Sequence, residues 1–152
     1  MNIKVGISID GNESHNKLRV DHAGKSSYKK TVNGIKMMQN LCPDQFSGLI
    51  AVVDFNQEPE KVMHALLRHN PPVLDLLQPF ITHDMLIGDQ KEYVDKFGDW
   101  MTRATNYWMD NKKYHKTSIR FIEDGLMTVL GHPPKSDWFG IRKISYLIIE
   151  TD

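Results

Sequence analysis

The sequence is short of cysteine and of long apolar runs. Cys42 is the one thiol among 152 residues, so no internal disulfide can form and nothing indicates an oxidising compartment. No apolar run approaches the roughly 20 residues that a membrane-spanning helix needs. The N-terminus also lacks the basic and apolar regions of a signal peptide. We therefore expect a cytoplasmic protein with no membrane segment.

The sequence also has no excess of positive or negative residues. Lysine and arginine together number 19, as do aspartate and glutamate, and this balance argues against a general surface for nucleic acid or anionic lipid. The histidines do not show the spacing of a metal site, because His64 and His69 lie five residues apart. His15 and His22 share a loop without a thiol or a third ligand. We predict no nucleic-acid partner and no metal site.

What the sequence does contain is a regular alternation of apolar segments. Its length fits a single domain over residues 1–152, and 40% hydrophobic residues are enough for a core. Segments rich in Val, Ile and Leu predict strands at residues 3–10, 46–55, 73–80, 117–122 and 144–152. Helical periodicity with capping or proline signals predicts helices from Ser26 or Ser27 to about Leu41, from Pro59 to Asn70-Pro71-Pro72, from Asp89 to about Trp108, and around 126–130.

Two of these helices carry an apolar stripe that should face a core. The stripe of the first consists of Tyr28, Val32, Ile35, Met38 and Leu41. The stripe of the third is aromatic and consists of Tyr93, Phe97, Trp100, Ala104, Tyr107 and Trp108.

Strands that alternate with helices indicate an α/β fold with a parallel sheet. The strands are apolar on both faces, as the buried strands of parallel sheets are. Parallel α/β folds place their chemistry at the carboxyl ends of the strands, so we expect a site there. Polar residues do follow the predicted strands, at Asp10-Gly11, Asp54-Phe55-Asn56, Gln78-Pro79-Phe80 and Glu150-Thr151-Asp152.

Three consecutive motifs near the N-terminus resemble one part of a known barrel. They read Ser8-Ile9-Asp10-Gly11, His15-Asn16-Lys17-Leu18-Arg19 and Gly24-Lys25-Ser26-Ser27-Tyr28. They resemble the fourth strand, the loop and the helix of the radical S-adenosylmethionine (radical SAM) barrel, in the peptide-modifying branch with a SPASM extension. Residues 71–84 and 146–152 resemble later segments of its cyclophane-forming subgroup. The resemblance implies that residues 1–152 are the C-terminal half of such a barrel: a partial TIM-type barrel of parallel strands alternating with helices.

The sequence departs from this family in three places. The Cys-x-x-x-Cys-x-x-Cys loop that holds the [4Fe-4S] cluster is missing, and Cys42 alone cannot replace it. Asn16 stands where the family has an aspartate, and Ser26 stands where it has a second glycine; we expect both changes to loosen the loop. The resemblance therefore implies a truncated part of a maturase of ribosomally made peptides, inactive alone, with the cluster belonging to the parent enzyme.

The resemblance assigns contacts with S-adenosylmethionine to Ser8, Asp10 and Arg19. In the family, the serine and the arginine bind the carboxylate of the cofactor, and a guanidinium fork suits that task. A buried strand serine, a turn-forming aspartate and a solvated loop arginine are the alternatives. We interpret Gln78 and His83 as surface loop residues rather than as contacts with a peptide substrate. No catalytic residue is assigned.

The alternative function is a non-catalytic interaction module. A half-barrel leaves unpaired edges at its first and last strands, and such edges recruit another chain. Residues 5–9 and 146–149 are apolar enough to pair in this way. We therefore expect a homo-oligomer or binding to a missing N-terminal half-barrel, while the peptide substrate would be a partner of the parent enzyme.

Overall fold

The computed structural model describes residues 3–79 and 90–136. The predicted strand at 144–152, the predicted cap at Asp89 and the candidate residue His83 lie outside the described residues. The helices and strands are, in chain order, β1 (Val5–Ser8), α1 (Tyr28–Leu41), η1 (Pro43–Gln45), β2 (Phe46–Val52), α2 (Pro59–Leu67), β3 (Val73–Leu77), α3 (Gln90–Asp110), η3 (Lys112–Tyr114), β4 (Ser118–Ile119) and α4 (Arg120–Val129).

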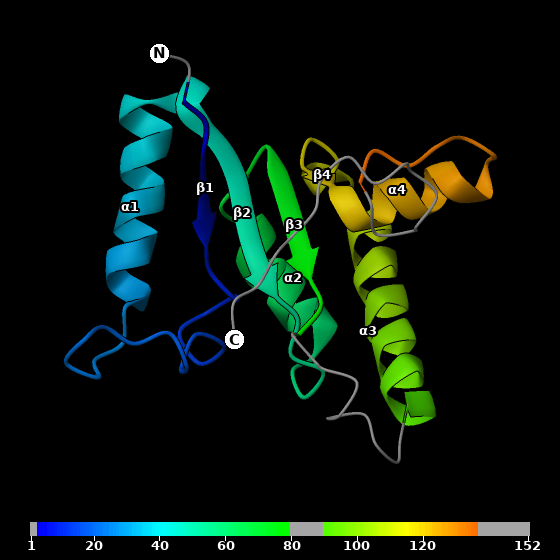
Figure 1. Ribbon diagram of the computed structural model, residues 1–152. Coiled ribbons are helices and arrows are strands. Elements are labelled where there is room, and N and C mark those ends of the chain that lie inside the picture. Colours follow the sequence, from blue (N-terminus) through cyan, green and yellow to red (C-terminus); the bar gives the residue numbers. More distant parts are fainter. Residues whose placement is uncertain (1–2, 80–89, 137–152) are drawn as a thin grey trace, which may run out of the picture.

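The described strands form one parallel sheet in the order β1-β2-β3-β4 (Figure 1). Each strand is joined to the next by a segment that contains a helix, as a parallel connection requires. Ser8 pairs with Ile50 across β1 and β2, and Leu49 pairs with Leu74 across β2 and β3. This arrangement confirms the predicted α/β class, a partial barrel of parallel strands alternating with helices.

The core lies between the sheet and the helices. Alternate residues of β2 and β3 point toward the helices, so that Leu49, Ala51, Leu74 and Leu76 are at most 2% exposed. In Figure 1, α2 crosses behind β2 and β3 and α1 stands beside β1. Pro59 opens α2 at the position where its missing amide costs nothing, as predicted. The residues of α2 that complete this core are Val62, Met63, Ala65, Leu66 and Leu67.

Two expectations about the helices are wrong. Leu41, the last member of the predicted α1 stripe, is 72% exposed because α1 ends there and Ile35 is the buried residue of that helix. The fourth strand is only Ser118–Ile119, and α4 begins directly at Arg120 rather than near residue 126. Ile122 belongs to the buried face of α4, so the apolar residues assigned to the strand serve the helix instead. None of the described helices combines the length and apolarity needed to cross a bilayer.

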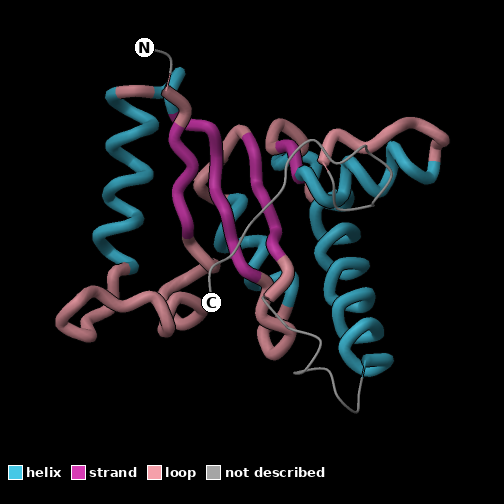
Figure 2. Tube along the Cα trace, in the orientation of Figure 1, coloured by secondary structure: helices cyan, strands magenta, loops and turns pink. Residues whose placement is uncertain are grey.

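The loops that follow β1 and β2, and residues 78–79 directly after β3, lie at the same end of the sheet (Figure 2). The longest of these described loops joins β1 to α1 and carries the motifs of residues 8–28. This end of the sheet is therefore where the candidate site residues meet.

Candidate functional site

Ser8 and Asp10 occupy the same face at the carboxyl end of β1. Side chains alternate along a strand, and Ile9 is completely buried among the helices, so Ser8 and Asp10 project from the opposite face. Ser8 is exposed, which excludes the alternative of a buried strand serine. Its hydroxyl makes no hydrogen bond within the described part of the chain.

Asp10 binds Arg19 through two parallel hydrogen bonds. Arg19 Nε donates to Asp10 Oδ2 at 2.6 Å, and Arg19 Nη2 donates to Asp10 Oδ1 at 2.8 Å. The two side chains retain 32% and 18% of their exposure, so the pair is partly shielded from water. The hydrogen bond to Asp10 raises the pKa of Arg19, although burial opposes this. Arg19 is therefore held in an ion pair and is not the freely solvated charge of the alternative interpretation.

The backbone around Arg19 is fixed as well. The hydroxyl of Ser27 donates to the Arg19 carbonyl at 2.9 Å, and the Ser27 amide donates to the same oxygen at 3.1 Å. Val20 and Ser26 form an antiparallel bridge beside it. Ser26 Oγ accepts a hydrogen bond from the Tyr28 amide at 3.3 Å in the turn before α1, and the cap position itself is occupied by Ser27, whose side chain makes no capping bond. The loop is thus closed onto the first turn of the helix.

Asn16 holds this loop together, so the expectation that it loosens the loop is wrong. Its side chain is nearly buried, with the residue 2% exposed. Its Oδ1 accepts the amide of Asp10 at 2.9 Å, and its Nδ2 donates to the carbonyl of Asn12 at 2.7 Å. An aspartate could accept the first of these bonds but could not donate the second unless it were protonated. The asparagine therefore suits the geometry of this chain.

His15 packs against Gly11 at the turn. Gly11 has φ of +130°, and a Cβ there would lie 2.3 Å from His15 Nδ1, so the position requires glycine. His15 Nδ1 accepts the amide of Asn12 at 3.1 Å, which places the proton of the neutral ring on Nε2. Burial lowers the pKa of His15, and a nearby carboxylate, Asp54, opposes this. The ring is therefore favoured in its neutral form.

A cavity of about 400 Å³ opens beside these residues, over the end of β2. Its volume falls within the range of small-molecule sites, about 300 to 1,000 Å³. Its lining combines apolar side chains with charged and amide groups, and Ser8 and Arg19 are not among the lining residues. The lining residues are Asp10, His15, Lys17, Leu18, Val52, Val53, Asp54, Phe55, Asn56, Pro79 and Tyr93.

Asp54 supplies a structured turn at this cavity. Its Oδ1 accepts hydrogen bonds from the amide and the side chain of Asn56, each at 3.0 Å. Burial opposes ionisation of Asp54, but these bonds and a longer one from Gln57 outweigh it and lower its pKa. Gln78 is exposed just after β3, which agrees with its interpretation as a surface residue.

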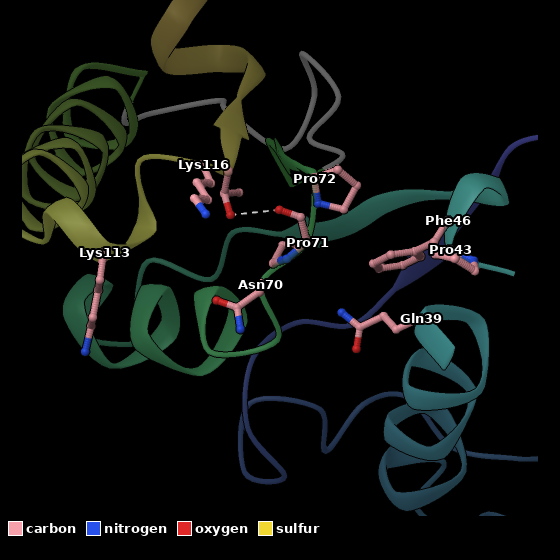
Figure 3. A pocket seen from close by; sticks show the side chains of 9 residues that line it. Gln39, Pro43, Phe46, Asn70, Pro71, Pro72, Lys113 and Lys116 are labelled. Atoms are coloured by element: carbon pink, nitrogen blue, oxygen red, sulfur yellow. Dashed lines mark hydrogen bonds between the residues drawn. The ribbon is translucent and has the colours of Figure 1, made fainter. Parts of the chain in front are cut away.

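A second cavity, of about 590 Å³, lies at the opposite end of the sheet (Figure 3). It is lined by Phe46 at the start of β2, by residues 70–72 just before β3 and by Gln39, and Thr117 Oγ1 donates to the Pro71 carbonyl at 2.7 Å. The amino ends of parallel strands serve stability in barrel folds, whereas the chemistry lies at the carboxyl ends. The site over β1 and β2 is therefore the candidate functional site.

No protein-family model matches the sequence, and no curated protein matches it. Solved structures do match the fold. They include native anSMEcpe with bound AdoMet and the Cp18Cys peptide, with a TM-score of 0.69, and native anSMEcpe with bound AdoMet and the Kp18Cys peptide, with a TM-score of 0.68. Each is 17% identical in sequence, and each match covers 89% of this chain and 38% of the other. The chain has the fold of part of a radical SAM barrel.

Within this radical SAM fold, two of the three residues predicted to contact the cofactor are bonded directly to each other. Asp10 and Arg19 are paired, and Ser8 lies on the same face without touching them through a hydrogen bond. Sequence reasoning missed Asn16 as a buried hydrogen-bonding residue and His15 as the residue that fills the space above Gly11. The spacing of Asn12, Ser14 and His15 was an available signal, because Asn12 Oδ1 accepts the amides of both later residues in a local Asx turn.

Proposed function

We propose that this chain is the S-adenosylmethionine-binding part of a radical SAM enzyme that modifies peptides. The fold supports this, and so does the structural neighbour anSMEcpe, which was solved with bound AdoMet and a peptide. In the enzymes that the sequence resembles, S-adenosylmethionine supplies a 5′-deoxyadenosyl radical that abstracts hydrogen from a peptide. Ser8, Asp10 and Arg19 remain the proposed cofactor site.

The residues present suit the cofactor. Arg19 Nη1 makes no hydrogen bond within the described residues, and neither does the Ser8 hydroxyl, so both can donate to a carboxylate. The cavity over β2 is lined in part by the apolar residues Val52, Phe55 and Pro79, which suit the adenosine. The single observation that carries the proposal is that Ser8 and Arg19 both keep free donors at the end of the sheet where the cavity lined by Asp10 opens.

The residues present do not suit a [4Fe-4S] cluster. Such a cluster needs several thiolates, and the 152 residues contain Cys42 alone. The structure places Cys42 at the end of α1, beyond Leu41. The cluster ligands would have to come from outside these residues, so we propose that the chain has no radical chemistry by itself.

Calorimetric titration with S-adenosylmethionine tests the cofactor site. Charge-assisted hydrogen bonds are worth about 1.5 to 3 kcal/mol, so Arg19→Ala should weaken binding by about tenfold or more. Arg103→Ala is the matched control, because Arg103 makes the same two-bond pair with Glu60 on the exposed side of α3. Wild-type chain that fails to bind the cofactor at millimolar concentration, or equal losses in the two variants, would contradict the proposal.

The alternative, an interaction module, is supported by the open edge of β1. Within the described residues β1 pairs with β2 alone, and Ile3 and Val5 are 50% and 36% exposed beside that edge. We propose that a second polypeptide, either another copy or one that supplies the rest of the barrel, pairs there. Light scattering across a concentration series measures self-association. A monomer at high concentration excludes the homo-oligomer.

A further inference from the structure

Arg19 offers a carboxylate two different edges, and one is already occupied. A guanidinium can donate two parallel hydrogen bonds from Nε and Nη2 or from Nη1 and Nη2. Asp10 takes the first edge, at 2.6 and 2.8 Å. The edge formed by Nη1 and Nη2 keeps its remaining hydrogens, and nothing in the described residues binds them. A ligand can therefore approach Arg19 from that side alone while the pair stays intact.

Asp10 is itself held from two sides. Its Oδ1 also accepts the amide of Val52, on the neighbouring β2, at 3.0 Å. Its own amide donates to the buried side chain of Asn16. The carboxylate cannot rotate away without breaking its bond to β2. Asp10 therefore fixes the guanidinium relative to the sheet and not only relative to the loop.

Arg19 is fixed at its other end by Ser27, which donates twice to its carbonyl. Backbone and guanidinium are both anchored, so the rotamer freedom of this long side chain is lost on folding. Ordering such a side chain at the moment of binding would otherwise weaken the affinity. The free edge is in place before any ligand arrives.

We propose that Asp10 is a positioning residue: it does not bind the carboxylate of the ligand, but it presents the Nη1–Nη2 edge of Arg19 to the carboxylate of an α-amino-acid group. This inference rests on the proposed binding of S-adenosylmethionine and gives Asp10 a role distinct from direct contact. The positioning role competes with a charge effect, because Asp10 cancels the positive charge of Arg19. Removing the charge of Asp10 strengthens the attraction for an anion, whereas removing its positioning weakens binding.

The experiment asks whether the affinity for S-adenosylmethionine rises or falls when Asp10 is replaced. S-adenosylmethionine and its decarboxylated form, which keeps the adenosine, sulfonium and amine, are titrated into the wild-type chain, Asp10→Asn and Asp10→Glu. Positioning predicts that both variants bind S-adenosylmethionine about three- to tenfold more weakly. It also predicts that they bind the decarboxylated form as the wild type does. Glu60→Gln, which loosens the equivalent pair with Arg103, should change neither affinity.

Each other outcome overturns the inference. Tighter or unchanged binding to Asp10→Asn shows that charge compensation dominates. Equal losses for both ligands show a merely structural role, and thermal melts of each variant identify unfolding as the cause. If Arg19→Ala abolishes binding while both Asp10 variants bind normally, the proposed cofactor site stands and the positioning role fails. If the wild type binds neither ligand, both fail.

Discussion

Replacing Asn16 by aspartate tests whether the loop between β1 and α1 has the geometry described. The change restores the residue type of the family that the sequence resembles, yet we expect it to destabilise this chain. The new carboxylate could still accept the amide of Asp10, but it would face the Asn12 carbonyl, which now receives a hydrogen bond at 2.7 Å. One hydrogen bond is lost, worth about 1 kcal/mol, and one oxygen of the buried new carboxylate is left without a donor, at about 1 to 3 kcal/mol, while the Asn12 carbonyl keeps its bond from the Asn16 amide at 3.1 Å. The expected loss of unfolding free energy at pH 7 is about 2 to 4 kcal/mol.

The loss should depend on pH. A buried carboxyl facing a carbonyl has its pKa raised in the folded state, because only the protonated form can donate to that oxygen. Stability relative to the wild type should therefore recover as the pH falls toward 4, since the folded state then binds the proton more tightly than the unfolded state. Urea denaturation at pH 7 and at pH 4 measures both values. Asn33→Asp, on an exposed position of α1, is the matched control and should change stability by less than about 0.5 kcal/mol. An Asn16→Asp variant as stable as the wild type at pH 7 would refute the reasoning.

Two further predictions concern residues outside the ion pair. Gly11→Ala should destabilise the chain by about 1 to 3 kcal/mol, because φ there is +130° and the Cβ would meet His15. Gly34→Ala, in the open middle of α1, should instead stabilise the chain by about 0.5 to 1 kcal/mol. Equal effects of the two variants in thermal melts would contradict this. Asp124 accepts hydrogen bonds from the amides of Lys135 and Ser136 and from the Ser136 hydroxyl. Burial opposes ionisation of Asp124, but these bonds outweigh it and lower its pKa, so its contribution is complete above the ordinary aspartate pKa of about 3.9 and is lost as the pH falls through the folded-state value. Asp124→Asn should therefore be less stable than the wild type at pH 7, and this difference should shrink below about pH 4 in denaturation curves.

The sequence was sufficient to predict the alternation of strands and helices because the signals are strong and local. Pro59 opens α2 at a position where proline is favourable, and the apolar segment of β2 forms a strand in which Leu49 and Ala51 are buried. The fourth strand was harder, since Ile119 and Ile122 have the same apolar character but belong to different elements. Where a strand passes directly into a helix, periodicity over six residues does not separate the two.

The candidate site was predictable in position but not in its contacts. Parallel strands place their carboxyl ends together, so Asp10 and Asp54 were expected at one end of the sheet. Asp10 and Arg19 are nine residues apart, and their pairing depends on how the loop between them folds back. No local propensity encodes this. The burial of Asn16 depends on the same fold-back, because an asparagine in a polar loop is ordinarily exposed.

The contacts that shape the β1–α1 loop are short in sequence. Arg19 is nine residues from Asp10 and eight from Ser27, and Asn16 is six from Asp10. Closing such small rings costs less chain entropy than pairing strands that are distant in the sequence, so these contacts hold the loop at a small entropic cost. The amide of Val52, 42 residues away, then locks the arrangement onto the sheet. The free edge of Arg19, where we propose that a carboxylate binds, is thus set mainly by contacts among the loop's own residues.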